Sequence, residues 1–152
     1  MNAHALSNEE SLETGYNYKV VIDYTDLVGT AATTKIIALT DTMPIGTKVE
    51  RAAARVAVAF AGTTTAVLEV GDDGDDHRNL VSFDMMSAAG TWKVAVPSST
   101  PSVFNAANTV DALFTGGANF TGITAGRVEI YLKIADLSLI QGGSATGGDA
   151  QV

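Results

Sequence analysis

The chain has 152 residues, the size of one domain, and 46% of them are apolar, which is enough to form a core without a stabilising crosslink. Only 17% are charged and the formal net charge is −8, so global disorder is excluded, and nucleic acid is not expected as a partner because phosphate binding needs clustered Lys and Arg. Cysteine is absent, which excludes disulfides and thiolate metal sites.

The N-terminal segment is polar and shows no hydrophobic period. We therefore expect residues 1–15 to form a flexible arm. The arm lacks the basic and apolar stretches of a signal peptide, and no apolar run reaches the length of a membrane span. No membrane partner is expected.

Residues 16–140 form the expected folded domain, because apolar residues there mostly alternate with polar or small ones, the period of β-strands. Abundant Thr and Val also favour strands over helices. The sequence predicts about eight strands between Gly-, Pro- and Asp-rich turns, in chain order Tyr18–Tyr24, Lys35–Thr40, Arg55–Phe60, Ala66–Val70, Asn79–Phe83, Trp92–Val96, Thr109–Phe114 and Arg127–Ile134.

The last of these strands has the clearest pattern, with one apolar face and one polar face. The predicted core face holds Val128, Ile130, Leu132 and Ile134, and the opposite face holds Arg127, Glu129, Tyr131 and Lys133. The segment Val49–Ala54 has good helix formers and is expected to form at most one helical turn. The predicted fold class is all-β, an antiparallel two-sheet sandwich of jelly-roll type, followed by a Gly-rich disordered tail at 141–152.

The most conspicuous polar segment contains four carboxylates, Asp72, Asp73, Asp75 and Asp76, and the imidazole of His77. Such a group could ligate a hard cation such as Ca²⁺, but it lacks the spacing and the closing Glu of an EF-hand. We expect a solvated turn between two strands and no resident metal or cofactor.

A contact with another subunit or with a capsid is the alternative role for this segment. The candidate contact residues are Asp75, His77, Arg78 and Tyr131, the last lying on the polar face of its strand.

The sequence contains no arrangement typical of an enzyme. His4 and His77 are the only histidines, and neither a Gly-x-Ser-x-Gly element nor a Gly-rich phosphate-binding loop is present. No catalytic residues are expected. The aromatic residues that a sugar-binding face might use are Tyr16, Tyr18, Tyr24, Trp92 and Tyr131; Trp92 alternates with Val94 and Val96 and is expected in the core.

Two segments carry a resemblance to a known family. Thr65–Leu80, with an apolar strand, then Val-Gly-Asp-Asp-Gly-Asp, an Arg and an apolar residue, resembles the central hairpin of small structural proteins from tailed bacteriophages. Thr124–Lys133 is similar to their closing strand, and the resemblance covers about residues 18–137.

The resemblance implies a head-decoration (cement) protein. Such proteins are β-rich and often homotrimeric, and they sit on the capsid exterior, where they bridge subunits of the major capsid protein against the pressure of packaged DNA. It also implies synthesis in the cytoplasm of a host bacterium. The alternative is a binding module of a phage fibre or tail that recognises a receptor or a carbohydrate.

Overall fold

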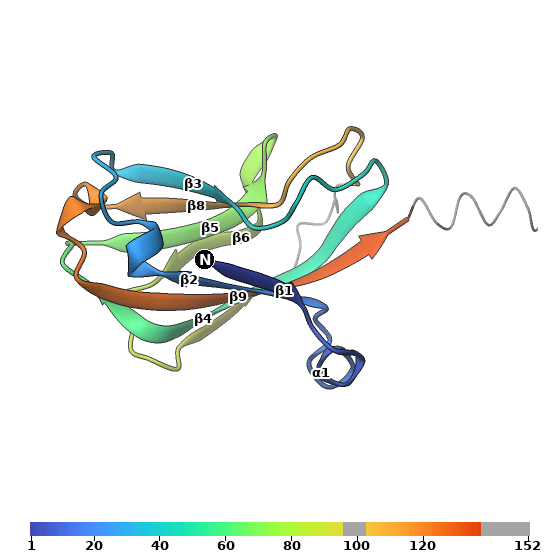
Figure 1. Cartoon of the computed structure of the whole chain (residues 1–152), viewed down its shortest axis with the longest axis horizontal. Coiled ribbons are helices and arrows are strands. Elements are labelled where there is room, and N and C mark those ends of the chain that lie inside the picture. The colour runs from blue at the N-terminus through green and yellow to red at the C-terminus, as the bar shows by residue number, and fades with distance from the viewer. Residues whose placement is uncertain (96–102, 138–152) are drawn as a thin grey trace, which may run out of the picture.

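The computed structural model describes residues 1–95 and 103–137, except for the side chains of Asp76 and His77. Within these residues, nine strands form two antiparallel sheets that face each other (Figure 1). The strands are β1 (Asn2–Ala5), β2 (Tyr18–Asp23), β3 (Thr34–Ala38), β4 (Thr47–Ala61), β5 (Ala66–Asp72), β6 (Asp75–Asp84), β7 (Trp92–Ala95), β8 (Asp111–Gly116) and β9 (Ala125–Asp136). One α-helix, α1 (Asn8–Thr14), and two 3-10 turns, Tyr24–Asp26 and Phe120–Gly122, complete the described elements.

The strand pairing is nested around the β5–β6 hairpin. Outward from that hairpin, β4 pairs with β7, β3 with β8, and β2 with β9. Pairing of β4 with β9 and of β5 with β8 then joins these pairs into one sheet of order β1-β2-β9-β4-β7 and another of order β3-β8-β5-β6. A long hairpin rolled across two sheets in this way is a jelly roll, so the predicted fold class is confirmed.

All eight predicted strands are present, but β4 begins earlier than predicted. At most one helical turn was expected at Val49–Ala54, and none forms, because this segment pairs with β9, for example Ala54 with Ile130. The small side chains of Ala52 and Ala54 are completely buried between the sheets. Tertiary pairing and packing therefore override the local helix propensity of the alanines.

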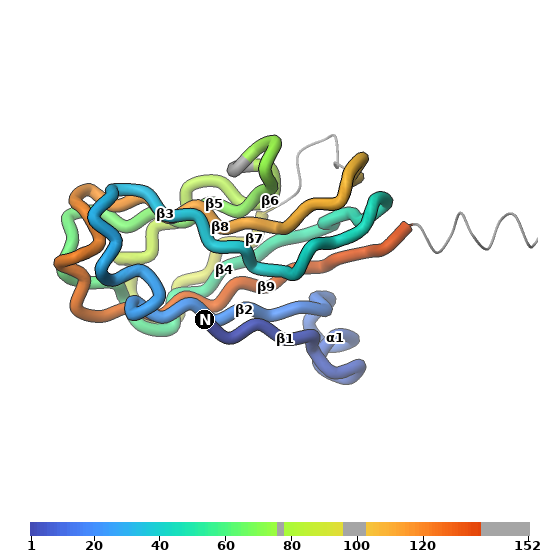
Figure 2. Tube along the Cα trace, turned by 45° about the horizontal axis from the view of Figure 1, so that its top comes forward, coloured from blue at the N-terminus to red at the C-terminus, as the bar shows by residue number. Residues whose placement is uncertain are grey.

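The N-terminal segment, expected to be a flexible arm, instead forms regular structure. Strand β1 pairs with β2 from Asn2↔Val21 to Ala5↔Tyr18, which adds a fifth strand at the edge of its sheet (Figure 2). Helix α1 begins with a capping box between Ser7 and Glu10 and ends at Gly15, whose φ is 75°. The tail at 141–152 lies outside the described residues.

The core lies between the two sheets and is formed by alternate residues of both. Its largest fully buried side chains include Phe114, Phe120, Ile22, Leu68, Ile130 and Leu132. The predicted faces of β9 are confirmed, since Val128, Ile130 and Leu132 are buried and Arg127 is exposed. Among the described residues, no helix is both long and apolar enough to cross a membrane.

Candidate interaction surfaces

The acidic segment, residues 72–76, forms the turn between β5 and β6, and its carboxylates differ in their exposure to solvent. Asp73 and Asp75 are exposed, whereas Asp72 is only 3% exposed. The Asp72 carboxylate pairs with Arg78 through Oδ2 and Nη1, 2.7 Å apart, and its Oδ1 accepts a hydrogen bond of 2.9 Å from the Gly74 amide. The expectation of a solvated turn is therefore wrong for Asp72, because the ion pair and the amide compensate its burial.

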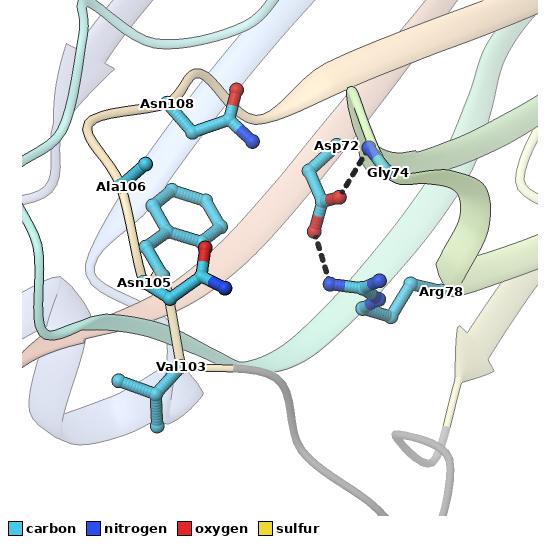
Figure 3. Close-up of a pocket in the computed structure, with 8 residues that line it drawn as sticks. Asp72, Gly74, Arg78, Val103, Asn105, Ala106 and Asn108 are labelled. Atoms are coloured by element: carbon cyan, nitrogen blue, oxygen red, sulfur yellow. Dashed lines mark hydrogen bonds and ion pairs between the residues drawn. The ribbon is translucent and has the colours of Figure 1, made fainter.

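A hollow of about 240 Å³ lies beside this ion pair (Figure 3). Asp72, Gly74 and Arg78 line one side, and the segment from Val103 to Asn108 lines the other. In the described part of the chain, no group of three or more acidic or imidazole side chains is placed to hold a metal ion. The side chains of the predicted candidates Asp76 and His77 lie outside the described residues.

Removing the partner of Asp72 is expected to destabilise this end of the sandwich. Arg78→Ala should lower the free energy of unfolding by about 2–3 kcal/mol, because it leaves a buried carboxylate without its counter-ion. Chemical denaturation measures the loss. The control Asp73→Ala, which changes an exposed carboxylate of the same turn, should stay within about 0.5 kcal/mol. Equal effects of the two substitutions would contradict a stabilising role for the pair.

The second surface is the outer face of the β1-β2-β9-β4-β7 sheet. Residues opposite each other in register point to the same side of a sheet, so Tyr131 shares this side with its neighbours Lys19 and Ala53, and Ala53 shares it with Val94. In the next row, Glu129 lies opposite Arg55, which lies opposite Trp92. We call this surface the aromatic face and define it by Tyr16, Lys19, Arg55, Trp92, Glu129 and Tyr131.

In the aromatic face, Tyr131 packs against both other rings, Tyr16 and Trp92. The ring centroids of Trp92 and Tyr131 are 5.4 Å apart with an interplanar angle of 35°, and those of Tyr16 and Tyr131 are 6.0 Å apart. The Arg55 guanidinium lies 5.7 Å from the Trp92 centroid, and the Lys19 ammonium lies 5.2 Å from the Tyr131 centroid. These distances are typical of aromatic and cation–π pairs, which hold the rings in place.

Glu129 forms ion pairs with both cations of the aromatic face, Lys19 and Arg55. Its carboxylate lies 3.0 Å from Lys19 Nζ and 3.3 Å from Arg55 Nη1, and it accepts a hydrogen bond of 3.0 Å from the Tyr131 hydroxyl. Burial alone would raise the pKa of Glu129, but the hydrogen bonds from Lys19 and Tyr131 and the nearby positive charges outweigh it, so this pKa lies below its usual value.

Glu129→Gln is expected to lower the free energy of unfolding at pH 7 by about 1–3 kcal/mol, because it removes charge-assisted hydrogen bonds. A carboxyl with a lowered pKa in the folded state stabilises the fold above its ordinary value, here 4.5, and that contribution is lost as the pH falls through the folded-state pKa. The difference from the unsubstituted protein should therefore disappear in acid. Denaturation curves from pH 7 to acid test this, with the exposed Asp41→Asn as control; a difference that persists in acid would contradict it.

Charge is unevenly distributed over the molecule. Among the register-paired residues of this outer face, six are Lys or Arg and two are Asp or Glu. The cations are Lys19, Lys48, Arg51, Arg55, Arg127 and Lys133, and the carboxylates are Asp23 and Glu129. A basic surface thus exists on a protein whose overall charge is negative.

The sequence placed some residues of this surface correctly and missed others. Tyr131 lies on the polar side of β9 as predicted. Trp92, predicted in the core, is 51% exposed, and Val94 is 62% exposed. The strand β7 lies at a sheet edge and turns these two apolar side chains outward. The alternation of Trp92 and Val94 with Lys93 predicted that the two share a face, but it could not tell which face of the strand is buried.

The comparisons with known proteins give similarities of fold. No family model matches the sequence, and no curated protein matches it significantly. A chain of the cyanophage Pam1 capsid asymmetric unit is similar in structure, with a TM-score of 0.47 and 16% identity over 76% of this chain and 80% of that chain. A chain of the acid-stable capsid of Helicobacter pylori bacteriophage KHP30 gives a TM-score of 0.37 and 12% identity over 77% of this chain and 96% of that chain. At these levels, neither similarity assigns a function to this chain.

Proposed function

We propose that this chain is a structural, non-enzymatic protein of a tailed-bacteriophage virion, which attaches to the capsid exterior and bridges subunits of the major capsid protein. The observation that carries the proposal is the aromatic face, where Trp92 and Val94 remain uncovered on the outside of a jelly roll. Exposed apolar and aromatic side chains on a sheet surface are typical of protein–protein interfaces. The proposal that the particle is a phage virion rests on the sequence resemblance to phage structural proteins. It does not rest on the jelly-roll fold, because a fold by itself does not imply a function.

We propose two contacts, one to the capsid and one between copies. For the capsid we propose the β5–β6 turn, with Asp75, His77 and Arg78, because the end of this hairpin projects from the body of the molecule (Figure 2). For the contact between copies, as a homotrimer, we propose the face that carries Tyr131. Several linked contacts on one particle raise the effective concentration, so weak single contacts give stable attachment.

Carbohydrate recognition by a fibre or tail module is the second candidate, favoured by the exposure of Trp92 beside Tyr131. The two rings are inclined by 35° and pack against each other. A sugar-binding platform needs rings that present their faces side by side to the ligand, so this geometry supports the protein interface more than the sugar site. Trp92 is the single tryptophan, and a change in its fluorescence upon titration with mono- and oligosaccharides would favour the carbohydrate role.

The test adds the purified protein to phage capsids that lack it, followed by sedimentation and heating. Bound protein and a higher melting temperature of the capsid are expected, because a ligand that prefers the assembled shell stabilises it by mass action. Asp75→Lys at the turn should weaken binding, whereas the control Asp41→Lys, an exposed carboxylate after β3, should not. No particle-bound protein together with unchanged capsid melting would reject the decoration role.

A further inference from the structure

Helix α1 does not pack into the core of its own domain. It projects from the β1-β2-β9-β4-β7 sheet (Figure 1), none of its residues is buried, and Leu12 is 87% exposed. Glu10 takes part in the capping box, whereas Glu9 and Glu13 are exposed and form no ion pair within the described residues. The helix therefore presents two carboxylates that are one turn apart, with the exposed Leu12 to one side of them.

The sheet beside α1 presents the complementary groups. Arg51 and Lys133 lie opposite each other in register on the same side as the aromatic face, and neither forms an ion pair within the described residues. Two residues along β4 from Arg51 is Ala53, which lies opposite the exposed Val94. Two residues of strand span about 7 Å. Val94 lies one strand further, about 4.8 Å to the side, so Arg51 and Val94 are about 8–9 Å apart on the sheet, a span that long Glu and Arg side chains can bridge.

We propose that α1 of one copy docks on the outer face of this sheet in a second copy. Leu12 contacts the apolar area formed by Trp92 and Val94, and the carboxylates of Glu9 and Glu13 pair with Arg51 and Lys133. Burial of the exposed leucine and tryptophan supplies stability, and the opposite charges determine the orientation.

The occupant is a second copy because α1 leaves its own face uncovered. The helix ends at Gly15, where an added Cβ would lie 3.8 Å from Arg51 Nη1, yet within the described residues its carboxylates form no ion pair with Arg51 or Lys133 of the same chain. The contact joins two different surfaces of the chain. Such contacts repeat from copy to copy and close into a ring when the rotation permits. This contact specifies, and rests on, the contact between copies proposed above, but it does not involve the capsid contact at the β5–β6 turn.

The experiment uses charge reversal on each side of the contact and measures mass by light scattering in the absence of capsids. The helix variant Glu9→Lys/Glu13→Lys and the face variant Arg51→Glu/Lys133→Glu should each raise the dissociation constant about tenfold or more, since like charges then face each other. Mixed together, the two variants should assemble again, because the acidic helix of one meets the basic face of the other and the reverse pair is also complementary.

Leu12→Asp should give a monomer with red-shifted Trp92 emission, and the control Ile45→Asp, the same change at an exposed apolar residue between β3 and β4, should leave the oligomer intact. The substituted residues are exposed or half-exposed, so the fold should be retained, which circular dichroism verifies. A wild-type monomer at about 100 µM, where contacts of ordinary affinity are saturated, would overturn the proposal. An oligomer that is indifferent to Leu12→Asp, or two charge variants that do not restore each other, would also overturn it.

Discussion

Replacing Phe114 by alanine is expected to lower the free energy of unfolding by about 3–5 kcal/mol, because a fully buried ring in the centre of the core leaves a cavity that the sheets cannot close. Phe114 lies in β8, between Lys35 of β3 and Leu68 of β5 in register. A domain of this size has a total stability of about 5–15 kcal/mol, so the substitution removes a large part of it.

Denaturant titration measures this loss, and two variants define its origin. Phe114→Leu keeps most of the apolar volume and should cost about 1.5 kcal/mol. Leu113→Ala changes the neighbouring residue on the outer side of the same strand, so it shares the strand context without opening the core. If Leu113→Ala cost as much as Phe114→Ala, the assignment of Phe114 to the centre of the core would be wrong.

Gly126→Ala is expected to destabilise the protein by about 2–5 kcal/mol, from backbone strain and steric overlap together. Gly126 has a φ of 144°, a conformation that residues with a Cβ rarely adopt. An added Cβ would lie 2.4 Å from Cγ of Phe60 and 2.5 and 2.6 Å from its two Cδ atoms. Because Phe60 is buried, its ring has no free space into which it can move.

Gly90 provides the control that separates the two causes. Its φ of 90° imposes a similar backbone requirement, but an added Cβ would have no atom within 4 Å. Gly90→Ala should therefore cost only the backbone strain, about 1–2 kcal/mol. Combining Gly126→Ala with Phe60→Leu should cost less than the sum of the single effects, since the smaller side chain relieves the overlap. Additive effects would show that the Phe60 contact is unimportant.

Local alternation in the sequence was sufficient to identify most strands and the two sides of β9. Val128, Ile130 and Leu132 repeat with a period of two over an uninterrupted strand, and the side-chain geometry of a strand converts that period directly into a shared face. The turns followed from Gly, Pro and Asp for similarly local reasons. Local patterns failed where a neighbour decided the outcome, as for Asn2–Ala5, a short polar segment that becomes a strand only because the edge of β2 offers it hydrogen bonds.

The class of fold and the residues that share a face of each strand could be predicted from the sequence, because both depend on the spacing of neighbouring residues. The strand pairing and the buried side of β7 became clear only in the folded structure, because both depend on residues far apart in the chain; Val20, for example, pairs with Ile130. The exposure of Trp92 and the burial of Asp72 belong to the second group. Trp92 is exposed because β7 turns it to the outside of its sheet, and Asp72 is buried because Arg78, on the neighbouring strand, neutralises its charge.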